Sequence, residues 1–372
     1  MDFTIPQEIE DFRILCQSFA KDKLFKEMRE GEKNRSLSQQ LATGLGELGL
    51  SDAVFQKTDT VSLLALSLAV EELAKGDVGG LLRNGLPGPY AGAISLATRH
   101  NLGDTPDLEE ILLLCQSNRL SVHLATCESL YPDIPSNARL AWSPGNIEDF
   151  HNYERQNEKG THVMVFIVGR DFVSLIPTDS VVATSSLPGA FEASGGISLD
   201  WSADPERIST LHSSKEALFV KSVARLWVSS ALVGLGQASV DYAIEYGKSR
   251  VVFDLPVVSH QANAFDLAEA STRLQGARLM TRMAASLSQD EDVKSSTWFM
   301  MAAQAYLESV EAAQFATGLG LLLLGGHGYM RDHPVEKWFR EASALPLLFG
   351  GQDSALADLD VLACDYIDPL VI

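Results

Sequence analysis

The chain has 372 residues, with 29 Lys and Arg against 49 Asp and Glu, a formal net charge of −20, and 46% hydrophobic residues. This length exceeds what one compact core usually holds, and the composition is that of a folded protein, so we expect several domains rather than disorder. The negative charge repels phosphate backbones and anionic headgroups, so we expect neither nucleic acid nor a membrane as a partner.

Cysteine usage and apolar runs set the expected cellular context. The cysteines show neither CxxC pairing nor the spacing of a metal site, so we expect no disulfide framework and no bound metal. They are Cys16, Cys115, Cys127 and Cys364. The start of the chain is acidic and lacks the apolar stretch of a signal peptide, and the apolar runs are too short to cross a bilayer. The sequence therefore predicts a soluble, cytoplasmic protein.

Residues 1–118 are predicted to form an N-terminal helical domain. Apolar residues recur at spacings of three and four from Ile9 to Phe19, and residues 61–75 form a long apolar run. Glycines and prolines follow, and then a second apolar helix is expected at about 90–99.

Residues 119–212 change to a β pattern. Short runs rich in β-branched and aromatic residues, separated by Gly, Asp, Pro and Ser, lie at 162–168, 172–176 and 197–201. We expect a small middle β domain here.

Residues 213–372 return to helix, in long Ala-, Leu- and Val-rich stretches without internal proline. These stretches are 215–247, 262–287, 294–324 and 353–368. The predicted fold class is therefore α+β but mostly α, with an N-terminal helical domain, a small middle β domain and a C-terminal four-helix bundle.

The most specific motif follows the first of these stretches. Tyr246, Arg250 and Phe253 precede His260-Gln261 in the pattern Y-x-x-x-R-x-x-F-D-x-x-x-x-x-H-Q. This pattern resembles that of the acyl-CoA dehydrogenase family, which has Gly in place of the Asp. The resemblance implies that Arg250 reaches a flavin pyrophosphate across a subunit interface, because a planar, permanently charged guanidinium suits a diphosphate. It likewise implies that Gln261 contacts the adenine side of the cofactor.

Other residues of this motif belong to the same implied cofactor-binding segment. They are Phe253, Val257 and His260.

A second motif, Gly325-Gly326-His327-Gly328-Tyr329, resembles the family's Q-x-x-G-G-x-G-Y, and residues 334–342 resemble its P-x-E-R-x-x-R-D-A. Glycine lets the backbone turn tightly and approach a ligand, so the resemblance implies a flavin contact at Gly326. Taken alone, such a glycine cluster is most often a helix C-cap.

Three further positions match the family less closely. Arg225, 25 residues before Arg250, stands where family members place an arginine at the substrate pocket. Thr126 resembles the Thr of a flavin-facing strand, and Trp142 resembles the Trp of the strand that flanks the isoalloxazine ring. The resemblance implies FAD as the cofactor and a CoA or carrier-protein thioester as the substrate.

The chain lacks the glutamate that the family uses as its catalytic base. A positioned carboxylate contributes roughly 10²–10⁴-fold to removal of the weakly acidic α proton. Its usual position holds Phe349, and the position used by a second subfamily holds Ala224. Neither side chain can accept a proton, so ordinary α,β-dehydrogenation by this chain alone is not expected, and no catalytic residue is assigned.

Two functions therefore stay open. The first is an enzyme with its own FAD that acts on a thioester by chemistry needing no such base, such as O2-dependent oxidation or oxygenation. The alternative is a non-catalytic subunit of a heteromeric acyl-CoA dehydrogenase, and Asp254 and Gly350-Gly351 resemble the corresponding residues of such subunits. We expect a homodimer or homotetramer, with a heteromer left open, because the resemblance puts Arg250 and Gln261 at a subunit boundary.

Overall fold

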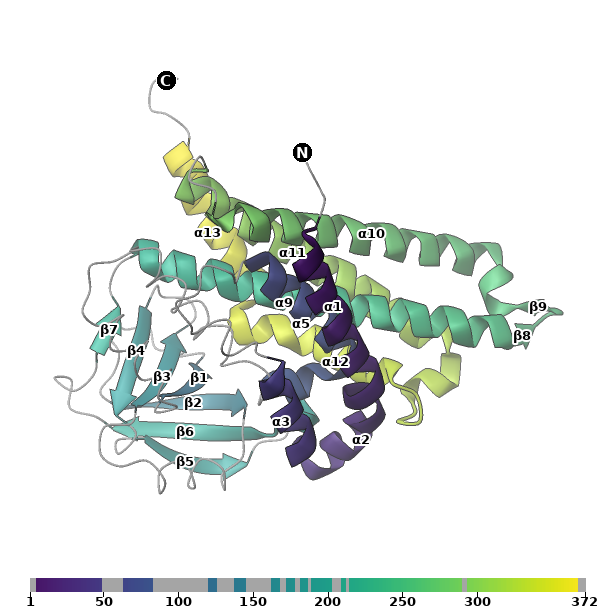
Figure 1. Cartoon of the computed structure of the whole chain (residues 1–372), viewed down its shortest axis with the longest axis horizontal. Coiled ribbons are helices and arrows are strands. Elements are labelled where there is room, and N and C mark those ends of the chain that lie inside the picture. The colour runs from purple at the N-terminus through teal and green to yellow at the C-terminus, as the bar shows by residue number, and fades with distance from the viewer. Residues whose placement is uncertain are drawn as a thin grey trace.

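The computed structural model describes residues 5–48, 63–82, 120–125, 137–144, 162–167, 172–177, 181–186, 189–202, 209–211, 214–289 and 293–366. Helices come first along the chain, then strands, then a second and longer set of helices (Figure 1). The predicted class, α+β but mostly α, is confirmed. The helix expected at 90–99 lies outside the described residues.

The N-terminal helices form one long rod followed by shorter pieces. The rod passes without a break from α1 through a π-helical turn into α2, and it ends at Arg35, whose φ is 51°. The elements are α1 (Gln7–Phe19), η1 (Ala20–Leu24), α2 (Phe25–Asn34), α3 (Gln39–Glu47) and α5 (Leu63–Gly80). Ser38 caps α3, because its hydroxyl accepts a hydrogen bond from the Leu41 amide. Helix α5 is kinked at Asp77, whose φ and ψ are −162° and 101°.

The described strands between residues 120 and 211 form two sheets. They are β1 (Leu120–Ala125), β2 (Asn137–Pro144), β3 (His162–Ile167), β4 (Phe172–Pro177), β5 (Val181–Ser186), β6 (Gly196–Ser202) and β7 (Ser209–Leu211). One sheet has the order β1-β3-β4-β7 and the other β2-β6-β5. Among the described strand pairs of these two sheets, only β1–β3 is parallel, with Leu120 opposite His162. The β runs predicted at 162–168, 172–176 and 197–201 correspond to β3, β4 and β6.

The C-terminal helices are α9 (Ser214–Ser249), α10 (Gln261–Ser286), α11 (Ser295–Leu323), α12 (Val335–Ala344) and α13 (Gly351–Tyr366). Four of them, α9, α10, α11 and α13, correspond to the predicted stretches. Helix α12 was not predicted, because it is only ten residues long and follows Pro334 directly. Short 3₁₀ turns at 257–259, 325–329 and 345–349 connect these helices.

Helix α9 is the centre of the packing. It lies against α11, α10 and α5, and buried apolar residues of α1, α5 and the C-terminal helices form one continuous core. The contact with α5 is close at Gly234, where an added Cβ would lie 2.2 Å from the carbonyl oxygen of Glu71. Only glycine allows this approach. The Glu71 side chain binds Arg278 of α10 at 2.8 Å, so α5, α9 and α10 are joined at one place.

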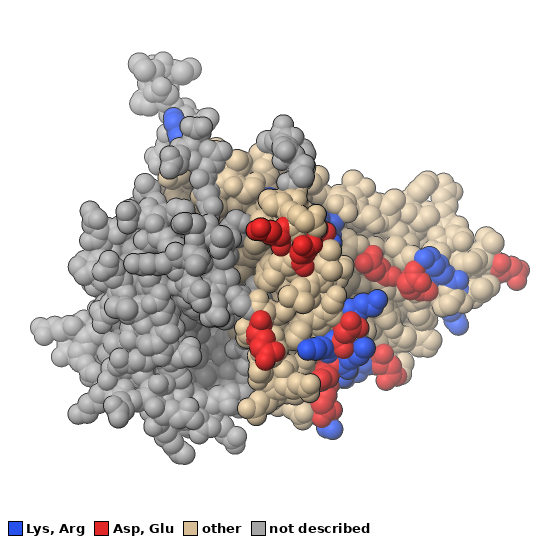
Figure 2. Space-filling model, in the orientation of Figure 1, with Lys and Arg blue, Asp and Glu red and all other residues tan. Residues whose placement is uncertain are grey.

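Charges of both signs are mixed over the described helices on the face shown in Figure 2. Within the described ranges, no helix combines the length and the apolar character required to cross a membrane. Nor does that part of the chain contain a cluster of three or more His, Cys, Asp or Glu side chains arranged to hold a metal ion.

Candidate functional site

The Arg250 motif forms a small hairpin at the far end of the α9–α10 pair, away from the two sheets (Figure 1). Its strands are β8 (Val251–Val252) and β9 (Leu255–Pro256). The two turn residues, Phe253 and Asp254, have φ values of 51° and 65°. Asp tolerates this left-handed region, but a bulky residue such as Phe is uncommon there. The turn holds the Phe253 side chain 89% exposed.

Internal hydrogen bonds fix the base of the hairpin. The Val257 amide donates to the Arg250 carbonyl oxygen at 2.8 Å, and His260 Nε2 donates to the Val252 carbonyl oxygen at 2.9 Å. Asn263 Nδ2 donates to the Val257 carbonyl oxygen at 2.8 Å. One ring nitrogen of His260 is therefore used within the chain to hold the hairpin in place. This supporting role is not evident from the motif alone.

The side chains of Arg250 and Gln261 remain exposed on either side of this support. Arg250 follows the last residue of α9, and Gln261 is the first residue of α10. Among the residues that the structure describes, no acidic group pairs with the Arg250 guanidinium. The structure thus brings Arg250, Phe253, Val257, His260 and Gln261 into one short segment with a free cation.

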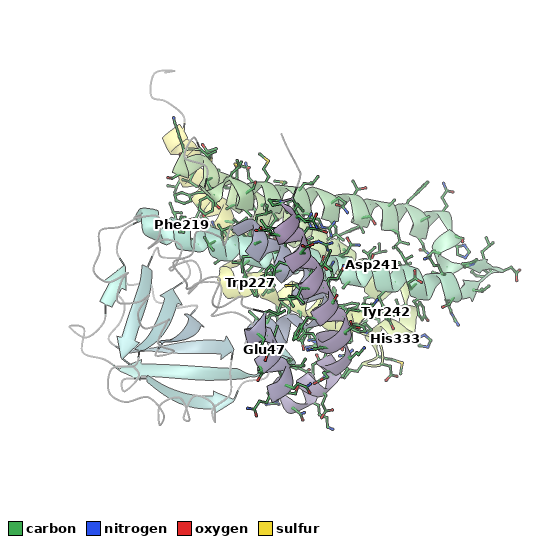
Figure 3. All side chains as sticks on the ribbon, in the orientation of Figure 1. Glu47, Phe219, Trp227, Asp241, Tyr242 and His333 are labelled. Atoms are coloured by element: carbon green, nitrogen blue, oxygen red, sulfur yellow. The ribbon has the colours of Figure 1, made fainter. Side chains whose placement is uncertain are left out.

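The glycine turn at 325–329 is joined to the same end of the molecule. The Tyr246 hydroxyl and His327 Nδ1 form a hydrogen bond of 2.6 Å, which connects α9 to this turn. Gly325 has a φ of 58°, and a Cβ added at Gly326 would have no atom within 4 Å. The backbone of Gly326 is therefore open to a ligand. Figure 3 shows a neighbouring contact, in which Tyr242 and His333 point toward one another.

Arg225 lies elsewhere and is not free. It precedes Arg250 by 25 residues on the same helix, which corresponds to about 37 Å along the axis. Only 3% of its surface is exposed, and its Nη2 lies 2.5 Å from Asp358 Oδ2 and 3.3 Å from Ser354 Oγ of α13. The Tyr306 ring lies beneath the guanidinium, 6.0 Å away. The neighbouring Ala224, at one of the two positions where the resemblance puts the base, is buried in α9.

Three other predicted positions receive less structural information. Thr126 lies outside the described residues. Trp142 lies in β2, where the register shifts between Leu140 and Ser143, but only its backbone is described. The same holds for Phe349, at the end of the turn that follows α12.

A buried ionic cluster lies where the kink of α5 meets α12. Lys337 Nζ lies 3.0 Å from Asp77 Oδ1 and 3.8 Å from Glu32 Oε1, and it donates a short hydrogen bond to Glu341 Oε1. Lys337, Asp77 and Glu341 are completely buried. One oxygen each of Asp77 and Glu341 finds no hydrogen-bond partner among the described residues. The sequence signal for this cluster was the Lys–Glu spacing of four within α12, and its burial could not be read from that spacing.

Burial and the neighbouring charges together raise the pKa values of Glu341 and Lys337 and lower that of Glu32. Burial raises the pKa of Glu341 to about 7, the Lys337 charge opposes that rise, and the Asp77 charge adds to it. Burial acts against the charge of Lys337, but Asp77, Glu341 and Glu32 outweigh it and raise the lysine pKa. For Glu32, burial is outweighed by Lys337 and by hydrogen bonds from Arg340 and Arg29, so its pKa is lowered.

Comparisons with known proteins agree with this geometry. Residues 221–359 match the family described as "Acyl-CoA dehydrogenase, C-terminal domain". The mitochondrial short-chain specific acyl-CoA dehydrogenase of Sus scrofa is 34% identical over 128 residues. The acryloyl-CoA reductase (NADH) of Anaerotignum propionicum is 30% identical over 127 residues. The matched stretch covers 34% of this chain in both cases, but only 30% and 31% of the two relatives.

Solved structures extend the likeness to the whole chain. Butyryl-CoA dehydrogenase from Megasphaera elsdenii superimposes with a TM-score of 0.74 at 20% identity, covering 99% of this chain and 100% of that one. A glutaryl-CoA dehydrogenase from Mycobacterium smegmatis in complex with FADH2 gives 0.73 at 18% identity, covering 96% and 94%. The ChsE4-ChsE5 complex from Mycobacterium tuberculosis gives 0.73 at 19% identity, covering 98% and 99%.

The molecule thus has the fold of the acyl-CoA dehydrogenases. The sequence relationship lies in the C-terminal helices, because residues 221–359 match the C-terminal domain of the acyl-CoA dehydrogenases. The resemblance inferred from the Arg250 and Gly325-Gly326 motifs is confirmed.

Proposed function

We propose that the chain is a subunit of a flavin-dependent oxidoreductase that binds FAD and acts on acyl-CoA thioesters. The observation that carries this proposal is the exposed end formed by the hairpin and the glycine turn. A diphosphate requires a permanently charged, planar donor and a backbone that it can approach closely, and Arg250 and Gly326 meet these two requirements. Bound FAD would supply the redox chemistry, and the residues of this chain would bind and orient it.

This exposed end binds the flavin of a neighbouring subunit. Arg250 and Gln261 project from the end of the α9–α10 pair, about 37 Å along α9 from the predicted pocket arginine. Arg250 and Arg225 therefore cannot contact the same diphosphate. Phe253, 89% exposed, would become buried once a second subunit covered the hairpin. The chain accordingly functions as a dimer or a larger oligomer.

The residues at the predicted base and substrate positions favour a non-catalytic role for this chain in a heteromer. Ala224 and Phe349 occupy the two positions of the family's base, and neither can accept a proton. Arg225 is neutralised by Asp358 of the same chain and is not available to a substrate. A partner that carries the glutamate would supply the base, while this chain contributes Arg250 and Gln261 to the shared flavin. The similarity to a complex of two different proteins, ChsE4-ChsE5, supports this arrangement.

A second candidate is an enzyme that carries its own FAD and oxidises its thioester with O2. The substitutions at 224 and 349 favour it as well, because a substrate that is already acidic needs little help from a base. This candidate requires one FAD per chain without any other protein.

Purification of the chain alone, and after co-expression with a glutamate-bearing acyl-CoA dehydrogenase, separates these functions. The heteromeric proposal predicts a colourless chain alone, a stable complex with bound FAD, and thioester oxidation only by the complex. One FAD per isolated chain together with O2-dependent turnover would contradict it and establish the second candidate. Absence of FAD in every preparation would contradict both proposed functions.

A further inference from the structure

Tyr246 joins the two segments of the exposed end directly. Its carbonyl oxygen accepts the Arg250 amide at 3.0 Å, and its hydroxyl forms the 2.6 Å hydrogen bond to His327 Nδ1. His327 immediately follows Gly326. One residue is therefore bonded both to the residue that carries the free guanidinium and to the turn that carries the open glycine.

The glycine turn has few other anchors on its ligand side. A Cβ at Gly328 would lie 2.3 Å from the Leu321 carbonyl oxygen, so the far part of the turn packs tightly onto α11. Gly325 and Gly326 have no such neighbour. Ordering a residue costs backbone entropy, and glycine loses the most conformational freedom of all residues. An anchor at His327 therefore decides whether Gly326 is held or moves.

We propose that Tyr246 and His327 are a positioning pair that sets the place of Gly326 relative to Arg250 and thereby the affinity for the flavin diphosphate. This inference rests on the proposed function of the exposed end. His327 is exposed and Tyr246 is half-buried, and a hydrogen bond at such a place contributes little to the stability of the whole fold. Its loss changes local order and ligand binding more than global stability.

The neighbouring pair, Tyr242 and His333, provides a matched control. Tyr242 lies one turn earlier on α9, and its hydroxyl and His333 Nδ1 form a hydrogen bond of 2.8 Å (Figure 3). His333 lies beyond the glycine turn, and its carbonyl oxygen accepts Arg29 Nη2 of α2 at 2.7 Å. The His333 ring also lies against the rings of Tyr246 and His327, with centroids 5.6 Å and 5.7 Å away. Tyr242→Phe removes only the hydroxyl and keeps the Tyr242 ring, so the direct hydrogen bond between Tyr246 and His327 remains.

Tyr246→Phe and Tyr242→Phe in the full chain test the inference by two readouts. Hydrogen exchange measured by mass spectrometry follows residues 325–329, and flavin fluorescence measures FAD affinity in whichever assembly binds it. Tyr246→Phe is expected to speed exchange in this turn severalfold and to weaken FAD binding about fivefold to tenfold, with the unfolding midpoint changed little. Tyr242→Phe is expected to leave both readouts at the wild-type values.

The outcomes separate the inference from the proposed function. Unchanged exchange in Tyr246→Phe overturns the positioning role, and so does faster exchange with unaltered FAD affinity. Equal effects of the two substitutions overturn it as well, because they would reflect a general loosening of α9. If the wild-type protein binds no FAD in any assembly, the proposed function fails, and the exchange comparison alone decides whether Tyr246 holds the turn.

Discussion

Arg225 of α9 and Asp358 of α13 form a buried ion pair, with 2.5 Å between Nη2 and Oδ2. Lys221, one helical turn before Arg225, binds the other carboxylate oxygen at 2.8 Å. A single acidic side chain thus binds two cations of α9 and holds α13 against it. The arginine at the predicted substrate position is therefore held in an ion pair within the chain.

The first prediction concerns this pair. Asp358→Asn leaves the Arg225 charge buried without its carboxylate, which costs about 2–4 kcal/mol of unfolding free energy, because removing one partner of a buried pair is strongly destabilising. Chemical denaturation measures the loss. Asp353→Asn, an exposed position on the same helix, is the control and should change stability by less than about 0.5 kcal/mol. Equal stability of Asp358→Asn and wild type would show that the pair does not hold α13.

The second prediction concerns the close approach of α5 and α9. Gly234→Ala puts a Cβ 2.2 Å from the Glu71 carbonyl oxygen, and a backbone atom cannot move aside without separating the helices. We expect a loss of about 2–3 kcal/mol. Gly276→Ala is the matched change on α10, because its Cβ would meet no atom within 4 Å, and it should stabilise the helix by about 0.5–1 kcal/mol. Thermal unfolding of both variants measures the difference, and two shifts of the same sign would refute the argument.

The third prediction concerns pH. The pKa of Glu341 is about 7 in the folded protein and near 4.5 when unperturbed, so between these values the folded state binds more protons than the unfolded state. The contribution of Glu341 to stability therefore falls as pH rises through this window, by up to about 1.4 kcal/mol per pH unit. Glu341→Gln removes this dependence.

Denaturation of wild type and Glu341→Gln at pH 5 and pH 7.5 measures it. The stability of the variant relative to wild type should increase between the two values. Glu336→Gln, a less buried position on the same helix, serves as the control and should not change the pH dependence in this way. A constant difference between wild type and Glu341→Gln would mean that the buried carboxyl does not carry the proton.

Much of the fold was predictable from local patterns. Long runs without proline indicated α9, α10, α11 and α13, and the β-branched runs indicated β3, β4 and β6. These signals are local, so they can be read from one sequence. Helix α12 is short, and Asp77 at the kink of α5 binds Lys337, a residue far away in the sequence, so neither had a comparable signal.

The candidate site was predictable in composition but not in its connections. The motifs identified Arg250, Gln261 and Gly326, which the structure puts at one exposed end. The motifs did not indicate the hydrogen bond between Tyr246 and His327 or the ion pair between Arg225 and Asp358. Both contacts join residues more than 80 positions apart, and such pairs depend on how the helices pack rather than on any local pattern.

We propose that Arg250 binds the flavin of a neighbouring subunit. FAD affinity measured by flavin fluorescence in the assembled protein, for Arg250→Ala against Lys248→Ala, tests it most directly. Lys248 is also exposed and lies two residues earlier, but it pairs with Glu245. Arg250→Ala is expected to weaken FAD binding at least about tenfold, because a charge-assisted contact to the diphosphate is worth about 1.5–3 kcal/mol, whereas Lys248→Ala should leave it unchanged. Equal affinities of Arg250→Ala and wild type would contradict it.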